Sequence, residues 1–272
     1  MQVKRNRLDG VPFDATPHVG GPITPRFIVM HYTAGGSALV SVRAIKDRGL
    51  SAHLFVERDG SIIQTVDFTT EAFHAGPSSW RGFNGLNGHS IGIEIANLGF
   101  LDRRAGDGWT REGLGRVFQP DQVVVARHRN GGPEMAWESY PEAQLRAVEA
   151  ITIALRATYP TIQEVVGHDD IAPRRKVDPG PAFPMRRFQS LGGAAGSGTL
   201  AERDLGQFEV VVRDELNLRG GPSPAFAVVA KLAPGTKLRV LREDGDWRLV
   251  DLQGDGVQDG FVHGAFLRRL GS

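Results

Sequence analysis

Two histidines and an aspartate stand where a strand end and a loop could bring them together. His31 closes the apolar run FIVMHYTAG, so we expect it at the carboxyl end of a buried strand. His168 opens GHDDIAPRRKVDPGPAFP, and Asp178 follows in the same segment, whose four prolines and missing apolar period indicate an ordered loop rather than a helix. Zinc accepts nitrogen and oxygen ligands, and catalytic zinc sites typically use three protein ligands and a water. This set could hold such an ion, although other divalent metals also accept imidazole and carboxylate.

Glu94 is a carboxylate inside an apolar strand pattern, GHSIGIEIAN. Strand alternation places it on the face opposite Ile93 and Ile95. It could be an edge-strand carboxylate in solvent. If it faces a partly buried cleft instead, its pKa is raised, which suits proton transfer.

Lys176 precedes Asp178 by two positions, so in an extended loop both side chains project the same way. A lysine beside a metal ligand could stabilise a developing oxyanion. The alternative is an ordinary solvated basic run, Arg174-Arg175-Lys176.

Strand and helix signals alternate in the first part of the chain, which predicts a sheet covered by helices. The helix Pro141–Thr158 has a periodic apolar face, and Ser37 could cap a second helix that runs to Lys46. The segment Phe100–Met135, rich in glycine, is expected to be a long irregular loop. The expected strands are Phe27–His31, Leu54–Glu57, Ile62–Val66 and Ile91–Ala96, with a hairpin turn at Arg58-Asp59-Gly60.

A Gly-, Ala- and Ser-rich stretch, residues 189–206, predicts a flexible linker between two domains, 1–188 and 207–272. After it, turn signals at Gly220-Gly221-Pro222, Pro234-Gly235, Asp244-Gly245 and Asp255-Gly256 separate short strands, which is typical of a small all-β barrel. The expected strands there are Val210–Val212, Lys237–Leu241, Arg248–Leu252 and Gly260–Val262.

Composition excludes several classes of function. The chain has 32 Lys and Arg against 31 Asp and Glu, so no global field recruits nucleic acid. With no cysteine, disulfides, zinc–thiolate sites and cysteine nucleophiles are excluded. No segment reaches the roughly 18 apolar residues of a membrane helix, so we expect no membrane insertion. The basic N-terminus lacks the apolar stretch of a signal peptide, so synthesis in the cytoplasm without a conventional leader is expected.

Five ordered motifs, spread over residues 25–188, together resemble the zinc-dependent N-acetylmuramoyl-L-alanine amidases of the type-2 amidase family, which includes the peptidoglycan recognition proteins. The motifs are FIVMHYTAG, SAHLFVERDGSIIQ, EAFHAG, GHSIGIEIAN and GHDDIAPRRKVDPGPAFP. The resemblance implies an α/β fold, a central mixed β-sheet flanked by helices, that cleaves the amide between N-acetylmuramic acid and L-alanine.

The same resemblance implies one zinc ion per chain, held by His31, His168 and Asp178. Glu94 matches the family's general base and Lys176 its oxyanion-stabilising lysine. Two further positions, His53 and His74, match histidines that line the cleft and are expected to contact substrate. Where the family often has Pro-Gly-Arg-Lys, this chain has Arg174 in place of the glycine, which changes the loop backbone but removes no reactive group.

The C-terminal part resembles a bacterial SH3-like domain through LNLRGGPS and GTKLRVLREDGDWRLVDLQGDGVQDGFVHGAFL. Such domains commonly bind cell-wall peptides, so the tail is expected to bind wall, the alternative being a domain that packs on the enzyme or dimerises it. Trp247 and Phe261 are as suited to a core as to a ligand platform.

Several functions remain open at this stage, and the expected partner in each is peptidoglycan or a muropeptide. The chain could recognise peptidoglycan without catalysis, although the complete set of reactive residues favours an enzyme. It could trim recycled anhydro-muropeptides in the cytosol, or act on the bacterial cell wall as a phage lysin released without a signal peptide. In a third alternative the tail is the functional part. The oligomeric state is left open.

Overall fold

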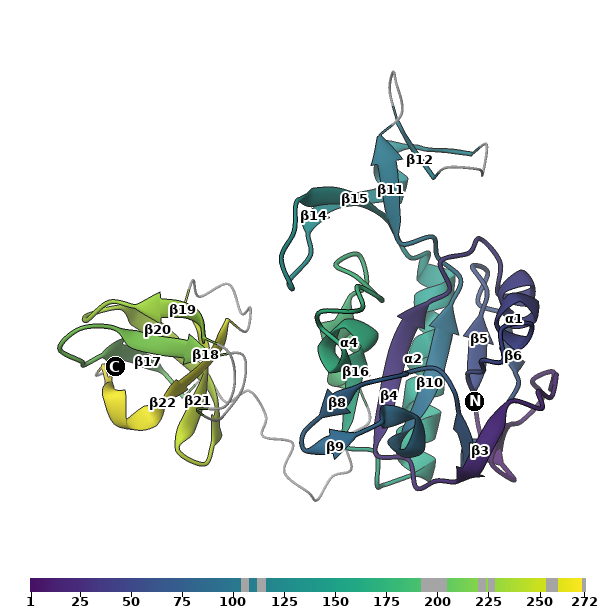
Figure 1. Cartoon of the computed structure of the whole chain (residues 1–272), viewed down its shortest axis with the longest axis horizontal. Helices are drawn as coiled ribbons and strands as arrows, with labels where there is room; N and C mark the ends of the chain where they lie inside the picture. The colour runs from purple at the N-terminus through teal and green to yellow at the C-terminus, as the bar shows by residue number, and fades with distance from the viewer. Residues whose placement is uncertain are drawn as a thin grey trace. The chain divides into compact units, whose positions relative to one another are not determined.

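The structure, a computed structural model, divides into two compact units, Met1–Ala195 and Gly196–Ser272 (Figure 1). Most of the expected linker, residues 192–204, lies outside the described part of the chain. The residues that the structure describes are 1–103, 108–111, 116–191, 205–219, 224, 228–252 and 259–270.

A five-stranded mixed sheet forms the centre of the first unit, in the order β16-β4-β10-β5-β6. The pairs β16–β4, β4–β10 and β10–β5 are parallel, whereas β5 and β6 form an antiparallel hairpin. The α/β prediction is therefore confirmed. The strands are β4 (Phe27–Tyr32), β5 (Leu54–Val56), β6 (Ile62–Gln64), β10 (Ser90–Ile95) and β16 (Glu164–Gly167).

Helix α2 (Glu142–Thr158) covers one face of this sheet, as its apolar period predicts (Figure 1). Val148, Ile151 and Leu155 on that face are fully excluded from solvent and belong to the main core. Gln144 fixes the start of the helix, because its side-chain amide donates to the carbonyls of Val56 (3.1 Å) and Ala96 (3.0 Å) at the ends of two strands.

Helix α1 (Ala38–Lys46) packs beside β5, close to the range that the sequence predicts. Ser37 stands at its N-cap position but its side chain makes no capping bond. Glu57 supplies the cap instead, because its carboxylate accepts from the Ala38 N–H at 2.8 Å. The short capping residue expected from sequence is thus replaced by a longer one that reaches across from the adjoining strand.

The two faces of the sheet have different chemistry. On β10, Ile91, Ile93 and Ile95 join the core that α2 covers. Alternation sends Gly92 and Glu94 to the other face, as predicted. That face also carries an apolar cluster under α1, which includes Phe55, the residue paired with Glu94.

The predicted irregular loop Phe100–Met135 is wrong, because this segment builds a second five-stranded sheet, ordered β13-β12-β11-β15-β14. Its own small core contains Leu98, Leu101, Phe118 and Ala136. Glycines mask the strands in the sequence, since Gly131 and Gly132 lie between β14 and β15 and the strands of this sheet are short antiparallel segments. The elements are β11 (Phe100–Arg103), β12 (Trp109–Thr110), β13 (Val117–Phe118), η2 (Pro120–Gln122), β14 (Val123–Arg127) and β15 (Glu134–Glu138).

Short elements complete the first unit. The segment after His168 begins with one helical turn, α3, where only a loop was expected, because Asp170 accepts from the Gly167 N–H at 2.7 Å and caps that turn. No helix among the described residues is both long enough and apolar enough to cross a bilayer. The remaining elements are β1 (Val3–Lys4), β2 (Arg7–Leu8), β3 (Val19–Pro22), β7 (Thr70–Ala72), β8 (Ser79–Trp80), β9 (Phe83–Asn84), η1 (Leu86–His89), α3 (His168–Ile171) and α4 (Met185–Gln189).

The second unit is a seven-stranded antiparallel sheet, ordered β19-β18-β22-β21-β20-β17-β23, which confirms the all-β prediction. Trp247 packs against the cluster of Leu241, Leu249 and Phe261. The predicted turns at 220–222 and 255–256 lie outside the described residues. The elements are β17 (Gln207–Val210), β18 (Leu216–Arg219), β19 (Val228–Leu232), β20 (Lys237–Asp244), β21 (Trp247–Asp251), β22 (Gly260–His263), η3 (Gly264–Phe266) and β23 (Leu267–Arg269).

Candidate active site

Strand register brings the predicted site residues to one edge of the central sheet. Glu94 of β10 pairs with His31 of β4, and Gly167 of β16 pairs with Met30, one residue before His31. His168 follows Gly167 directly. Three neighbouring parallel strands therefore deliver His168, His31 and Glu94 side by side at their carboxyl ends, the edge at which open α/β sheets bind ligands.

Three of the predicted residues converge on one point. The Nδ1 atoms of His31 and His168 lie 2.9 Å apart, and Asp178 Oδ2 lies 3.0 Å from the first and 2.9 Å from the second. All three residues are buried: His31 is 1% exposed, His168 is 2% exposed and Asp178 is 7% exposed. The structure thus brings together the set that spacing alone could only suggest.

Hydrogen bonds on the far side of each imidazole decide which nitrogen carries the proton. His168 Nε2 donates to the Ala75 carbonyl at 3.0 Å, so its Nδ1 carries a lone pair. His31 Nε2 lies 3.0 Å from His74 Nδ1. His74 Nε2 lies 3.4 Å from Ser90 Oγ, which itself donates to the Leu86 carbonyl at 2.5 Å.

An acceptor therefore faces His74 Nε2, which must carry that ring's proton and leaves Nδ1 as an acceptor. His31 then donates from Nε2, and its Nδ1 also carries a lone pair. Two lone pairs and a carboxylate oxygen point at one another with no proton between them. Such a set of acceptors is stabilised by a cation.

The pKa shifts keep the cluster in this form. Burial, with the neighbouring His168, lowers the pKa of His31 to about 4. Burial acts to raise the pKa of Asp178, but the two histidine rings beside it outweigh burial and hold that pKa below its usual range. Neutral imidazoles and an ionised carboxylate are the forms that bind metal ions.

The geometry of the cluster fits a divalent metal. Ligands about 2.0–2.1 Å from a tetrahedral zinc ion are separated by about 3.3 Å, close to the 2.9–3.0 Å edges found here. The three donor atoms all lie within 4.8 Å of one another. His31, His168 and Asp178 would therefore provide three ligands and leave further coordination positions for water or substrate.

Glu94 lies next to the cluster without belonging to it. Its side chain is half-buried, and burial, followed by the charge of Asp178, raises its pKa well above the ordinary value, with Lys176 opposing the shift. Lys176 is also half-buried, and its charge acts on both Glu94 and His31. A carboxylate of raised pKa and an ammonium group thus share the neighbourhood of the three ligands, as the sequence predicts.

His74, expected to contact substrate, is half-buried and lies against His31. Its ring lies over Gly92, where a Cβ atom would approach the ring to 2.5 Å, so only glycine admits it. Both ring nitrogens are engaged, one by His31 and the other by Ser90. A partner on the second nitrogen of a ligating histidine typically fixes its orientation.

His53, the other expected substrate contact, is fully buried. Its Nδ1 accepts from the Gly92 N–H at 3.1 Å and its Nε2 lies 2.9 Å from the Thr70 carbonyl. Burial lowers its pKa to about 4. With both nitrogens bonded to backbone, its geometry favours a structural role, in which it holds β10 against the segment around Thr70.

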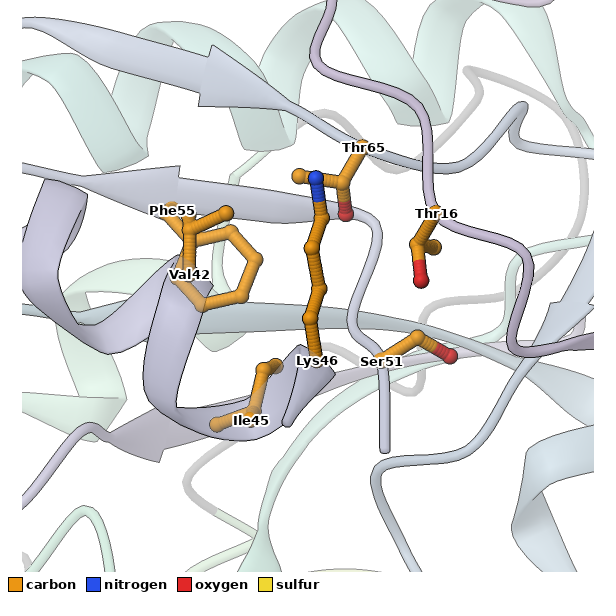
Figure 2. Close-up of a pocket in the computed structure, with 7 residues that line it drawn as sticks. All are labelled: Thr16, Val42, Ile45, Lys46, Ser51, Phe55 and Thr65. Atoms are coloured by element: carbon orange, nitrogen blue, oxygen red, sulfur yellow. The ribbon is translucent and has the colours of Figure 1, made fainter. Parts of the chain in front are cut away.

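A small hollow elsewhere in the unit takes no part in this chemistry. It lies beside α1, and it is too tight to hold a water molecule. Figure 2 shows the Lys46 side chain running through it. The Lys46 ammonium donates to the carbonyls of Asp14 (3.1 Å) and Ala15 (3.0 Å) and pairs with the Asp14 carboxylate at 2.7 Å, so its charge is already neutralised.

Comparison with known proteins agrees with the site. Residues 21–181, more than half of the chain, match the family described as N-acetylmuramoyl-L-alanine amidase. The chain belongs to that family. Residues 214–268 of this family member match the bacterial SH3 domain, so both expected resemblances are confirmed.

Two curated relatives place this family member among amidases. It is 34% identical over 143 residues to the 1,6-anhydro-N-acetylmuramyl-L-alanine amidase AmpD of Salmonella typhimurium (strain SL1344), covering 52% of this chain and 57% of that protein. It is 32% identical over 175 residues to the N-acetylmuramoyl-L-alanine amidase AmiD of Escherichia coli (strain K12), covering 61% of this chain and 53% of that protein. The chain therefore spans a little over half the length of these relatives.

A solved structure shows the same fold. The crystal structure of a selenomethionine AmpD derivative superposes with a TM-score of 0.51 at 26% sequence identity, covering 71% of this chain and 99% of that one. The fold expected from the sequence motifs is thus found in a member of the family.

One group of residues near the site was missed at the sequence level. His128, Arg129 and Asn130 contact Asp169, the neighbour of His168. The only signal was the paired aspartates of GHDD, of which Asp170 caps α3 and Asp169 is left to be neutralised elsewhere.

Proposed function

We propose that this chain is a zinc-dependent amidase that hydrolyses the amide bond between N-acetylmuramic acid and the L-alanine of the stem peptide. The observation that carries the proposal is the convergence of three unprotonated acceptors, His31, His168 and Asp178, beside Glu94. A recognition protein without catalysis needs no such set. Family membership and the names of both curated relatives support the same bond.

The three ligands would hold the metal ion, and the bound ion would supply Lewis acidity at this edge of the sheet. Glu94 accepts the proton of the attacking water, since its raised pKa lets it hold that proton. It then returns the proton to the amine nitrogen that leaves with L-alanine. Lys176 places its positive charge where the carbonyl oxygen becomes negative.

The substrate could be a soluble muropeptide or the polymeric wall. The name of the AmpD relative specifies a 1,6-anhydro-muramyl substrate for that protein, which supports a small recycled fragment here. The SH3 domain over residues 214–268 supports polymeric wall, to which it would bind. We favour action at the bacterial cell wall, because a wall-binding domain gives no advantage when the substrate is a soluble fragment.

The test is product analysis of purified sacculi and of soluble anhydro-muropeptides treated with zinc-loaded protein. Release of stem peptides with a free L-alanine amine is expected, and a chelator should abolish it. Glu94→Gln should retain zinc and lose about 10²–10⁴-fold in kcat, because general acid–base catalysis contributes that much. Cleavage of fragments but not of sacculi would reassign the substrate to recycled muropeptides.

A second pair of variants separates the two interpretations of the basic run. Lys176→Ala should lower kcat by about 10²–10³-fold, the cost of removing one oxyanion-stabilising group. Arg174→Ala is the matched control, since it removes an exposed cation two positions away. Equal losses in both variants would mean a general electrostatic effect. Zinc-loaded protein that cleaves neither substrate would refute the amidase assignment.

A further inference from the structure

The turn between β14 and β15 makes several hydrogen bonds to Asp169, the residue that follows the candidate metal ligand His168. His128 donates from Nε2 to Asp169 Oδ2 at 3.0 Å, and its Nδ1 accepts from the Asn130 N–H at 3.1 Å. Arg129 donates to Asp169 Oδ1 at 2.6 Å, and the Asn130 amide donates to the Asp169 carbonyl at 2.9 Å. Three consecutive residues of one turn thus satisfy a single aspartate.

Asp169 in turn connects the beginning of the segment after β16, which carries His168, to its later part, which carries Asp178. Its backbone N–H donates to the Asp178 carbonyl at 2.8 Å. A Cβ atom at Gly167 would lie 2.2 Å from Asp169 Oδ1 and 2.8 Å from Pro179 Cδ, so only glycine leaves room for this packing. The Asp169 side chain is 4% exposed, and its position is therefore set by its partners rather than by water.

The same hairpin also covers the chain just after Asp178. Trp137 of β15 is 2% exposed, and a Cβ atom at Gly180 would approach its ring to 2.9 Å. The Trp137 N–H donates to the Ala126 carbonyl of β14 at 3.1 Å, and its ring centre lies 5.8 Å from that of His128. Contacts from one hairpin therefore reach both ligand-bearing loops.

The base of the hairpin is fixed to the strand that carries Glu94. Glu138 is 1% exposed, and its carboxylate accepts from the Leu98 N–H at 2.7 Å and pairs with Arg58. The Asn97 amide donates to the Glu138 carbonyl at 3.1 Å. Asn97 and Leu98 lie just after β10, which carries Glu94, so the hairpin is bonded to the chain near Glu94 through Glu138. Through His128 it is also bonded to Asp169, next to His168. Figure 1 shows β14 and β15 beyond the ends of β4 and β10.

We propose that the β14–β15 hairpin is a positioning element for the metal centre, with His128 and Asp169 as its positioning residues. This inference rests on the metal site of the proposed function. His168 directly follows β16, but Asp178 comes later in a segment with only one helical turn, α3, so the sheet alone does not fix Asp178. The hairpin supplies the missing restraint and holds both ligands at the separation a metal requires. Part of the segment 100–135, expected to be a loop, thus supports the ligands through Asp169.

The test is the affinity of the full chain for Zn²⁺ alone, measured at neutral pH by competition with a chromophoric chelator. Cobalt absorption spectra report ligand geometry in the same samples. His128→Phe keeps a ring and removes the donor to Asp169, so it should weaken zinc binding by about 10-fold, the low end of the effect of direct partners of metal ligands, because His128 acts one residue further out. It should also alter the cobalt spectrum. His128→Gln keeps an N–H in place of Nε2 and should restore both readouts.

Arg127→Ala is the matched control, because this exposed side chain lies on the same hairpin one position earlier. It should leave affinity and spectrum unchanged. The inference is overturned if His128→Phe binds Zn²⁺ as tightly as the unmodified chain, if His128→Gln loses as much affinity as His128→Phe, or if the unmodified chain binds no zinc. The assay uses no substrate, so protein that shows the expected affinities yet cleaves no muropeptide would refute the proposed function alone.

Discussion

Two clusters of histidine and aspartate include a residue of α3, His168 in the first and Asp169 in the second. The two clusters differ in how their hydrogen-bond donors and acceptors are arranged. In the first, His31, His168 and Asp178 present acceptors to one another at 2.9–3.0 Å. In the second, His128 and Arg129 present donors to the acceptors of Asp169 at 3.0 and 2.6 Å. Each cluster pairs a buried histidine with a buried aspartate, so that pairing does not by itself identify the metal site.

What separates the clusters is where each histidine keeps its proton. The Ala75 carbonyl and His74 hold the Nε2 protons of His168 and His31, which empties the space between the Nδ1 atoms. In the other cluster the Asn130 N–H occupies His128 Nδ1, which forces the proton of that ring towards Asp169. Hydrogen-bonding groups around each cluster, from backbone and side chains, therefore decide whether its histidine nitrogens face the aspartate as acceptors or as donors.

The largest effect should come from Asp178→Asn. The amide keeps the shape of the side chain but removes the anionic ligand, so the chain should lose its metal ion and its hydrolytic activity should fall to background. Metal analysis after gel filtration and chromatography of products measure both. Asp169→Asn, the matched change in the closed cluster, should retain the ion with weaker affinity. Asp178→Asn protein that keeps its metal would break the distinction between the clusters.

An intermediate effect should appear in the thermal stability of the metal-free chain. With a chelator present, Asp178→Asn should melt at or above the temperature of the unmodified protein, because the amide can donate to an imidazole Nδ1 where only acceptors met before. Asp169→Asn should melt about 2–10 °C lower, since a buried hydrogen bond to a charged group contributes about 1–3 kcal/mol. Circular dichroism measures both. Equal decreases in melting temperature for both variants would mean that the acceptors of His31, His168 and Asp178 do not repel one another when no cation is bound.

The smallest effect concerns acid unfolding away from both clusters. Arg187 donates to Glu142 at 2.9 Å, and with Arg146 it lowers the pKa of Glu142 to about 2. A folded pKa below the unfolded value means that this pairing stabilises the protein above about pH 4.5 and that the contribution is lost as the pH falls towards 2. The difference in melting temperature between Glu142→Gln and the unmodified protein should therefore shrink over that interval.

The Glu142→Gln measurements give the acid sensitivity of the exposed Glu142–Arg187 pair, which touches neither cluster. They therefore provide a reference for the stability changes measured in the Asp178 and Asp169 variants. A difference in melting temperature that stays constant from pH 6 to pH 2 would show that the pair contributes nothing through ionisation.

The strands of the central sheet could be predicted because their signals are local, whereas the three candidate metal ligands were only suggested by residue type and spacing and were implied by the family resemblance. FIVMH and SIGIEI are apolar runs whose alternation assigns each side chain to a face, and register then places His31 beside Glu94. The strands of the inserted sheet could not be predicted, since β12 and β13 are two residues each and are stabilised by pairing partners distant in sequence. The roles of His53 and His74 depend on backbone acceptors that no pattern of residue types reveals.

Gly92 has a consequence for how sequences of this kind can diverge. The His74 ring occupies the space that any Cβ atom at position 92 would need. A mutation to a larger residue at 92 is therefore tolerated only after the ring at 74 has been lost or moved, and that change alters the support of His31. Positions 74 and 92 should consequently covary across related sequences, and the order in which they change should be constrained: the ring leaves first, and glycine is released afterwards.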